Sequence, residues 1–281
     1  MRLLVQETRD GLSYRVIRCQ ACGVIQTWEQ HAALSPDYRS LPPEEVDEAR
    51  VWCQYQHKLP AFAQWEGNVA QHALLPPGPL LDVGCGTGGF LRHAAQRGWA
   101  PYGFDASLAQ AEFARRYCPN ARQATSVAEY REALAAPLPL MHMITLWDVL
   151  EHIRQPEALL SGLRDLLHPE GLLFISVPNG GALSWKKGVH RILGRPFSVD
   201  PWEHVFYYTR AALATHLATW GFRVVASGSV TCYPRPWSWF EMMRRVGFRV
   251  LSHLPDLSPQ IYVLARKCVG SAGHGVFDKI C

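Results

Sequence analysis

The chain has 281 residues, of which 48% are hydrophobic and 19% are charged, as in an ordinary globular protein. Its net charge of +4 does not by itself indicate a nucleic-acid-binding protein, and no apolar run reaches the length of a transmembrane helix. The first residues lack the apolar core of a signal peptide, and the eight scattered cysteines do not predict a disulfide framework. We therefore expect a cytoplasmic protein with one large domain and an appendage.

Residues 1–28 predict a small β element. Two apolar runs, Leu3–Val5 and Tyr14–Ile17, flank Asp10-Gly11, a residue pair typical of a tight hairpin turn. We therefore expect the two runs to pair as antiparallel strands.

The segment RCQACGV follows this hairpin, and its Cys19 and Cys22 have the spacing of a zinc knuckle. A structural zinc site needs four ligands, usually two such pairs, and the chain has one pair. Cys53 and His57 offer two more ligand atoms, but their spacing does not form a second knuckle. We therefore predict that no metal ion is bound here.

Residues 29–79 predict a helical connector that ends in a short linker at 74–79. Pro42-Pro43, with the acidic residues after it, is typical of a helix start. Apolar residues then recur at spacings of three or four, as in an amphipathic helix, which we expect Pro60 to divide in two. This stripe is interpreted mainly as a surface that packs on the main domain: Val51, Trp52, Tyr55, Leu59, Phe62 and Trp65.

The stretch LLDVGCGTGGFL, residues 80–91, predicts a strand, a tight turn and a helix. Its four glycines allow the backbone to approach a ligand closely, and the N–H groups at the helix start point out of the loop. Asp82 precedes the first glycine. No Lys-Ser/Thr pair follows the last glycine, which excludes a phosphate-binding P-loop. The alternative is a tight turn that binds no ligand.

The block LDVGCGTG within this stretch resembles motif I of the class I methyltransferases that use S-adenosylmethionine, nearly letter for letter. The resemblance implies an α/β fold with a Rossmann-like, doubly wound sheet of seven strands, the last of them antiparallel, and a small N-terminal β and helical appendage. It also implies that S-adenosylmethionine is the cofactor. The cofactor-binding residues implied in the motif are Asp82, Gly84, Cys85, Gly86, Thr87 and Gly88.

The resemblance also implies a division of the chain. Methyltransferases of this type often have an N-terminal zinc ribbon, and the first cysteine pair of such a ribbon would here be absent or lie before Met1. In related proteins, helices before the main domain cover the cofactor. We expect a partial zinc-ribbon-like hairpin at 1–28, a helical connector or cap at 29–79, a cofactor-binding domain at 80–267 with insertions at 180–208 and 231–259, and a flexible tail at 268–281.

A second strand is expected at Pro101–Phe104, and it ends in Asp105, 21 positions after Gly84. An acidic residue at this place can accept hydrogen bonds from the hydroxyl groups of a ribose. Ala106 follows it and is included in the predicted cofactor site. A third strand is expected at 120–125. Family members often have an acidic residue near the adenine there, whereas this chain has Thr125, Ser126 and Val127, of which Ser126 and Val127 are predicted cofactor contacts.

A fourth strand is expected at Met141–Thr145, and it leads into LWDVLEHI. Residues 147–152 of this block resemble the family's motif around Leu-Glu-His. They lie at the carboxyl end of the expected strand, where ligands of such sheets bind. The resemblance implies that Trp147 and Asp148 contact the cofactor and that His152 lies near the acceptor. The alternative for Glu151 and His152 is helix capping and local hydrogen bonding.

The remaining elements complete the predicted sheet. A helix at 156–167 is followed by a turn at Pro169–Gly171 and by the buried strand GLLFISVPN. The last two strands are expected at Phe222–Val230 and Gln260–Arg266, and the second of these would be the antiparallel strand of the family.

The two insertions contain the remaining functional candidates. In the first, His204 precedes an aromatic run and Thr209, a good N-cap for the next helix. The second contains tryptophans, methionines and arginines at 234–255. Its composition fits a substrate lid, a helix on a membrane surface or a packing element, so peripheral contact with a membrane or lipid stays open.

These features together predict transfer of a methyl group from S-adenosylmethionine to a small-molecule acceptor, with a lipid-like acceptor as one case. A hydroxyl acceptor would need a base, and His204 and His152 are the candidates, since imidazole titrates near neutrality. Transfer to oxygen, nitrogen or carbon stays open.

Three alternatives are less favoured. The first is a methyltransferase acting on RNA or protein, although the basic residues form no concentrated track and we expect no nucleic-acid partner. The second is a non-catalytic subunit that binds S-adenosylmethionine. The third, an NAD-dependent dehydrogenase, does not fit the glycine loop with its preceding acid.

Overall fold

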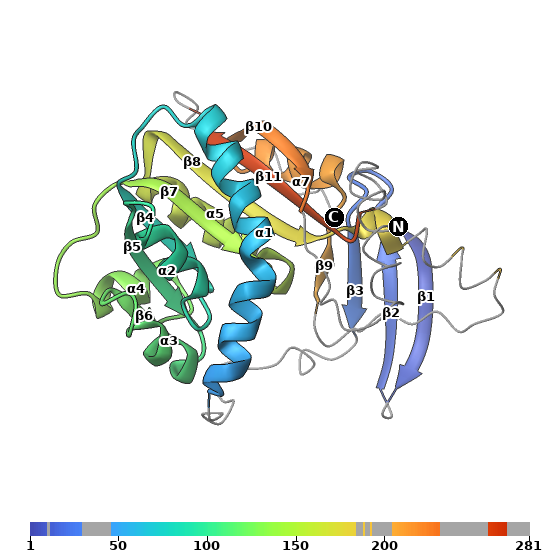
Figure 1. Ribbon diagram of the computed structural model, residues 1–281. Coiled ribbons are helices and arrows are strands. Elements are labelled where there is room, and N and C mark those ends of the chain that lie inside the picture. The colour runs from blue at the N-terminus through green and yellow to red at the C-terminus, as the bar shows by residue number, and fades with distance from the viewer. Residues whose placement is uncertain are drawn as a thin grey trace.

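The computed structural model describes residues 1–9, 12–29, 46–183, 188, 192, 204–230 and 258–268 (Figure 1). The predicted helix start at Pro42-Pro43, the hairpin turn at Asp10-Gly11, and nearly all of the second insertion and the tail lie outside these residues. None of the described helices is both long enough and apolar enough to cross a membrane.

Among the described residues, the larger sheet has seven strands in the order β10-β11-β8-β7-β4-β5-β6. Strands β4 to β8 are parallel to one another, and β11 is antiparallel to both β8 and β10. The predicted seven-stranded doubly wound sheet with its antiparallel last strand is therefore confirmed. The strands are β4 (Pro79–Val83), β5 (Ala100–Asp105), β6 (Ala121–Gln123), β7 (Met141–Trp147), β8 (Leu167–Pro178), β10 (Phe222–Ser229) and β11 (Gln260–Lys267).

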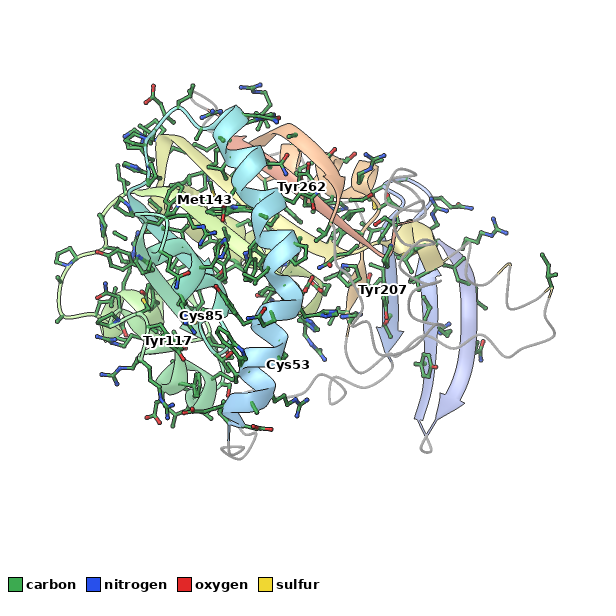
Figure 2. All side chains as sticks on the ribbon, in the orientation of Figure 1. Cys53, Cys85, Tyr117, Met143, Tyr207 and Tyr262 are labelled. Carbon is green, nitrogen blue, oxygen red and sulfur yellow. The ribbon has the colours of Figure 1, made fainter. Side chains whose placement is uncertain are left out.

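Helices cover both faces of this sheet, because successive strand residues point to opposite sides. On β4, Leu80 packs with one buried cluster and Leu81 with the other. Met143 and Tyr262, labelled in Figure 2, belong to the cluster beneath α1 (Glu48–His72), α2 (Gly89–Ala95) and α3 (Leu108–Ala114). The opposite cluster packs under α4 (Val127–Ala133), α5 (Pro156–Leu166) and α7 (Arg210–Thr219).

Helix α1 is one continuous helix of 25 residues, so the expectation that Pro60 divides it was wrong. Asp47 caps its start by accepting a hydrogen bond from the backbone N–H of Ala49 at 2.9 Å. Phe62 and Trp65, in the turns after the proline, are buried against the sheet face. Burial of large aromatic side chains outweighs the loss of one backbone hydrogen bond, so α1 runs unbroken along that face (Figure 1).

Strand β8 begins earlier than expected. Pro169–Gly171 does not form a separate turn but lies within β8, where the register with β7 shifts between Met141 and Met143. Leu167 and Leu172 are the partners of those two methionines, so the extra residues of β8 are taken up in an irregularity of the ladder. A side chain at Gly171 would come within 2.8 Å of the Met141 carbonyl oxygen, which explains the glycine.

In the described part of the chain, three N-terminal strands and β9 form a second sheet of four strands, in the order β1-β2-β3-β9. The predicted hairpin is confirmed as β1 (Arg2–Arg9) and β2 (Leu12–Arg18), which pair antiparallel. Strand β3 (Ile25–Glu29) was not expected, nor was its pairing with β9 (Phe206–Tyr207), from the first predicted insertion. The appendage is therefore joined through β9 to the segment that follows β8 (Figure 1).

Candidate active site

The glycine loop between β4 and α2 has the backbone conformation that requires glycine. Gly84, Gly86 and Gly88 have φ angles of 66°, 54° and 77°, in the left-handed region. A Cβ atom on Gly84 would lie 2.5 Å from a methyl carbon of Val149. The loop therefore lies directly against the segment that follows β7.

Asp105, at the carboxyl end of β5, is tied to this loop. One carboxylate oxygen accepts a hydrogen bond from the N–H of Gly86, and the other accepts one from the N–H of Ser107, each at 2.9 Å. Burial raises the pKa of Asp105, while these two hydrogen bonds lower it. Each carboxylate oxygen retains acceptor capacity for a further donor. The neighbouring Ala106 accepts a hydrogen bond from Gln123 through its carbonyl oxygen.

The remaining predicted residues of the motif lie deeper. Asp82 is 2% exposed and accepts a hydrogen bond from the Thr145 hydroxyl at 2.6 Å, and burial raises its pKa to about 8. Cys85 is buried, which raises the pKa of its thiol, and Thr87 is half-buried in the loop. Asp82 thus forms a buried hydrogen bond with β7 just before the glycine loop begins.

Ser126 and Val127 lie at the start of α4. The Ser126 hydroxyl caps this helix by accepting a hydrogen bond from the N–H of Glu129 at 3.2 Å, and Val127 packs in the core. The carboxylate of Glu129 in turn accepts hydrogen bonds from Thr125. An acidic residue therefore does stand near the third strand, although it comes from the helix rather than directly after the strand.

Trp147 and Asp148 lie at the carboxyl end of β7. The Trp147 ring packs with Phe62 of α1 and Phe90 of α2. Asp148 has a φ of 57°, an uncommon conformation for a residue with a side chain. Its carboxylate forms an ion pair with Lys58 of α1 at 2.6 Å and accepts hydrogen bonds from Ser176 and Gln260. Neither Lys58 nor Gln260 was recognised from sequence, because each reaches the site from a distant element.

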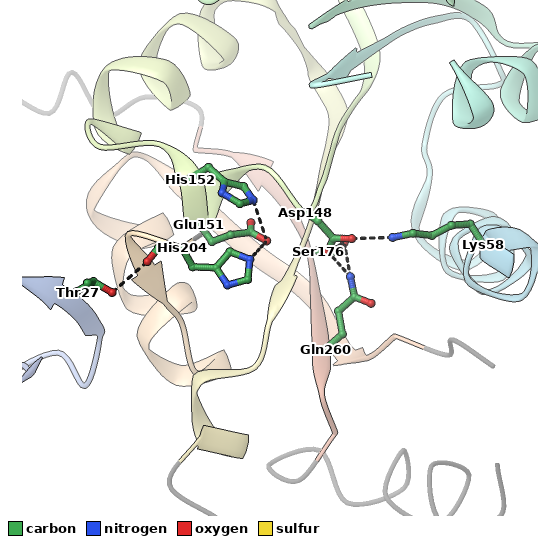
Figure 3. Close-up of polar contacts among 8 residues, drawn as sticks. All are labelled: Thr27, Lys58, Asp148, Glu151, His152, Ser176, His204 and Gln260. Atoms are coloured by element: carbon green, nitrogen blue, oxygen red, sulfur yellow. Dashed lines mark hydrogen bonds and ion pairs between the residues drawn. The ribbon is translucent and has the colours of Figure 1, made fainter. Parts of the chain in front are cut away.

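Three titratable residues meet beside Asp148, and we call them the histidine cluster: Glu151, His152 and His204 (Figure 3). Glu151 and His152 belong to the short helix η1 (Leu150–His152), and His204 lies just before β9. Both imidazoles point toward the Glu151 carboxylate, each with its Nε2 atom 4.0 Å from the same oxygen. The two rings are 4.9 Å apart between centroids.

The Glu151 carboxylate is unusual in its environment. Its side chain is fully buried, and neither oxygen has a hydrogen-bond partner among the described residues. No side-chain hydrogen bond caps η1 among the described residues, whereas local hydrogen bonding of Glu151 and His152 stays an alternative interpretation. Burial and then the nearby Asp148 charge raise the pKa of Glu151 well above its ordinary value. Burial therefore favours the protonated form of Glu151, and its carboxylate form is favoured by a positive charge on a neighbouring imidazole.

The same three side chains could also hold a metal. Their ligand atoms lie within 4.8 Å of one another, and one carboxylate with two imidazoles is a donor set that suits zinc. Cys19 and Cys22 lie at a separate turn, closed by hydrogen bonds from the Cys19 N–H to Val24 and from the Gly23 N–H to Cys19.

The site residues fit S-adenosylmethionine. A side chain at Gly84 would collide with Val149, and one at Gly88 would collide with Ala114. The loop backbone therefore packs directly against these two residues. Asp105 lies beside this backbone and can accept hydrogen bonds from hydroxyl groups. Glu151 and His152 of the histidine cluster closely follow Val149, which lies against the loop. A nucleotide-like ligand and an acceptor can therefore bind at the same edge of the sheet.

Comparison with known proteins supports this assignment. A family model described as a methyltransferase domain matches residues 55–253. Two curated relatives, both ubiquinone biosynthesis O-methyltransferases, come from Histophilus somni and Cereibacter sphaeroides and are 34% and 32% identical. The matches cover 38% and 58% of this chain and 47% and 62% of the relatives, so the chain spans about half the length of the relatives it matches.

A solved structure shares the fold. The 1,6-didemethyltoxoflavin-N1-methyltransferase of Burkholderia thailandensis, solved with 1,6-didemethyltoxoflavin and S-adenosylhomocysteine, is 18% identical, with a TM-score of 0.52. That match covers 95% of this chain and all of the other. Together with the family match over more than half of the chain, these findings show that the protein belongs to the S-adenosylmethionine-dependent methyltransferases.

Proposed function

We propose that the protein transfers a methyl group from S-adenosylmethionine to an oxygen atom of a small, hydroxylated acceptor. The observation on which this proposal chiefly rests is the histidine cluster, in which the buried Glu151 carboxylate is flanked by two imidazoles. An oxygen acceptor loses a proton on methylation, and a base placed beside it assists that loss. The names of the two curated relatives support an oxygen acceptor.

In this proposal the glycine loop and Asp105 hold the cofactor. The backbone of residues 84–88 lies along its amino-acid part, and the Asp105 carboxylate accepts hydrogen bonds from the ribose hydroxyls. The further contacts are Asp82, Ala106, Ser126, Val127, Trp147 and Asp148. When bound, S-adenosylmethionine supplies a methyl group on a positively charged sulfur.

His204 acts as the base, with His152 as the second candidate. The acceptor hydroxyl donates its proton to an imidazole nitrogen, and the Glu151 carboxylate stabilises the imidazolium that forms. The buried position of Glu151 strengthens this interaction, because little water screens it. Assistance of this kind is typically worth about 10²–10⁴-fold in rate.

The acceptor is proposed to be aromatic or lipid-like. The Tyr207 ring lies edge-on to the His204 ring, 5.3 Å away between centroids, and Phe206 packs on Tyr208. Aromatic side chains beside one titratable group suit a largely apolar acceptor. We also propose that residues 80–267 form the cofactor-binding domain, with the segments before it as additions to the acceptor side.

A panel of acceptors tests this function. Purified protein is incubated with methyl-labelled S-adenosylmethionine and caffeic acid, dodecyl gallate, total RNA or an unfolded protein mixture. We expect label in the two phenolic compounds, on oxygen, and more of it in dodecyl gallate if the acceptor is lipid-like. Cofactor binding without transfer to either phenol, or transfer to RNA or protein alone, would contradict the proposal.

A further inference from the structure

The His204 segment is held from two sides by elements distant in the sequence. On one side, the N–H of Thr27 of β3 donates to the Val205 carbonyl oxygen at 3.0 Å. The Thr27 hydroxyl donates to the His204 carbonyl oxygen at 3.1 Å (Figure 3). On the other side, the Val205 N–H donates to the Glu151 carbonyl oxygen at 2.9 Å. The backbone at 204–205 thus lies between the N-terminal sheet and η1.

The hydroxyl of Thr27 is buried and has its hydrogen-bond acceptor in His204. Thr27 is 4% exposed, and its bond to His204 satisfies a buried hydroxyl that would cost free energy without a partner. Within the described residues, the ladder between β3 and β9 has two residue pairs, Ile25 with Tyr207 and Gln26 with Phe206. His204 lies beyond the end of that ladder. There, the two hydrogen bonds from Thr27 extend the pairing of β3 with the segment before β9.

The other side of β9 is also anchored. Tyr208 forms a bridge with Asn179, at the end of β8, and the N–H of Gly180 donates to the Tyr208 carbonyl oxygen at 2.8 Å. These contacts hold the chain after His204 but do not reach His204 itself. Thr27 and Glu151 both form hydrogen bonds with the His204–Val205 backbone.

We propose that Thr27 is a positioning residue for His204, and that the N-terminal sheet is a working part of the acceptor site. This inference rests on the proposed role of His204 in methyl transfer. Thr27 acts through the backbone of its partner: it holds the main chain at 204–205 so that the imidazole faces Glu151. Small displacements of a catalytic group can cost large factors in rate, so losing this contact lowers turnover without touching the cofactor.

The first test needs no acceptor. Thr27→Val removes the hydroxyl and keeps the β-branched shape, and Thr27→Ser restores the hydroxyl. Thr219→Val is the matched control, because the Thr219 hydroxyl also donates to a histidine carbonyl, that of His216, at 2.7 Å within α7. In protein with labelled histidines, we expect Thr27→Val to shift the His204 imidazole resonances, Thr27→Ser to restore them, and Thr219→Val to leave them in place.

The second test measures turnover of dodecyl gallate at saturating cofactor. We expect kcat for Thr27→Val to fall by about 10- to 100-fold, with an unchanged Kd for S-adenosylmethionine and with recovery in Thr27→Ser. In a His204→Ala background, Thr27→Val should cause no further loss, since the two act as one unit. If Thr27→Val gives little folded protein, Thr27→Ala removes the same hydroxyl with a smaller side chain.

Unshifted His204 resonances, or a kcat for folded Thr27→Val equal to that of Thr219→Val, would overturn the inference. The His204→Ala variant keeps this failure separate from that of the proposed function. A large loss in His204→Ala with none in Thr27→Val removes only the positioning role. Normal turnover in His204→Ala removes the proposed role of His204 as the base, and absence of transfer to either phenol by the wild-type protein removes the proposed function itself.

Discussion

The glycine loop and the histidine cluster lie along the same edge of the large sheet, but they are assembled differently. The loop joins β4 directly to α2, and its shape depends on backbone conformations at Gly84, Gly86 and Gly88. The cluster brings Glu151 of η1 together with His204, from a segment that the N-terminal sheet holds in place. One half of the site is thus local in the chain, and the other depends on tertiary contacts.

We infer that the glycine loop serves to bind the cofactor and that the histidine cluster serves the chemical step. The loop offers backbone groups and the Asp105 carboxylate, which suit a ligand that is held but not changed. The cluster contains a buried carboxylate and two imidazoles, which suit proton transfer. Changes in the loop should therefore alter cofactor affinity, and changes in the cluster should alter turnover.

The largest expected effect concerns Glu151. Glu151→Gln keeps the size of the side chain but removes the carboxylate that would stabilise an imidazolium, so we expect kcat to fall by about 10²–10⁴-fold. The melting temperature should stay the same or rise, because a neutral amide replaces a buried carboxyl group whose ionisation burial disfavours. Glu157→Gln, on the exposed start of α5, is the control. A kcat as high as that of this control would show that Glu151 has no part in the chemistry.

A smaller effect is expected on the loop side. Asp105→Ala removes a charged acceptor worth about 1.5–3 kcal/mol, so the Kd for S-adenosylmethionine should rise roughly 10- to 100-fold. Isothermal calorimetry measures it, with exposed Asp165→Ala as the control. Asp105→Asn, which retains one acceptor oxygen, should lie between the two. Equal affinity in folded Asp105→Ala would remove Asp105 from the cofactor site.

Asp82 should make stability depend on pH. Burial raises its folded-state pKa from 3.8 to about 8, so the folded protein binds the proton more tightly than the unfolded chain. This contribution is fully present below about pH 4 and is lost as the pH rises toward about 8. Denaturant unfolding across this range should show stability falling with pH. In Asp82→Asn the fall should be shallower, and an identical slope in both proteins would contradict the assignment.

The smallest expected effect is at the cysteine turn. Elemental analysis of purified protein should find no stoichiometric zinc, because Cys19 and Cys22 supply two of the four ligands that a structural site needs. One zinc per chain that disappears in Cys22→Ser would show the prediction to be wrong. A metal that disappears in His204→Ala would instead assign it to the histidine cluster and argue against proton transfer there.

Much of the fold could be predicted because its signals are local. The glycines of the loop, the apolar strand runs and the leucine stripe of α5 each depend on residues close together in the chain. Helix α1 could be predicted too, but not its continuity through Pro60, since that depends on burial of Phe62 and Trp65 against the sheet.

The rest depends on contacts that local patterns do not contain. Strand β9 has two residues and forms because β3 lies beside it. His152 and His204 could both be placed at the carboxyl edge of the sheet, yet their approach to one Glu151 oxygen follows from the loop path between Thr27 and η1. Lys58 has no sequence signal, because many exposed helix positions hold lysine.

Methyl transfer by the His204→Ala variant tests the central claim most directly. Wild-type protein, His204→Ala and His168→Ala, a histidine outside the cluster, are compared with labelled S-adenosylmethionine and dodecyl gallate at saturation. We expect His204→Ala to fold and to bind the cofactor normally, and to transfer methyl about 10²–10⁴-fold more slowly than the other two. Equal rates in all three well-folded proteins would contradict a role for His204 as the base.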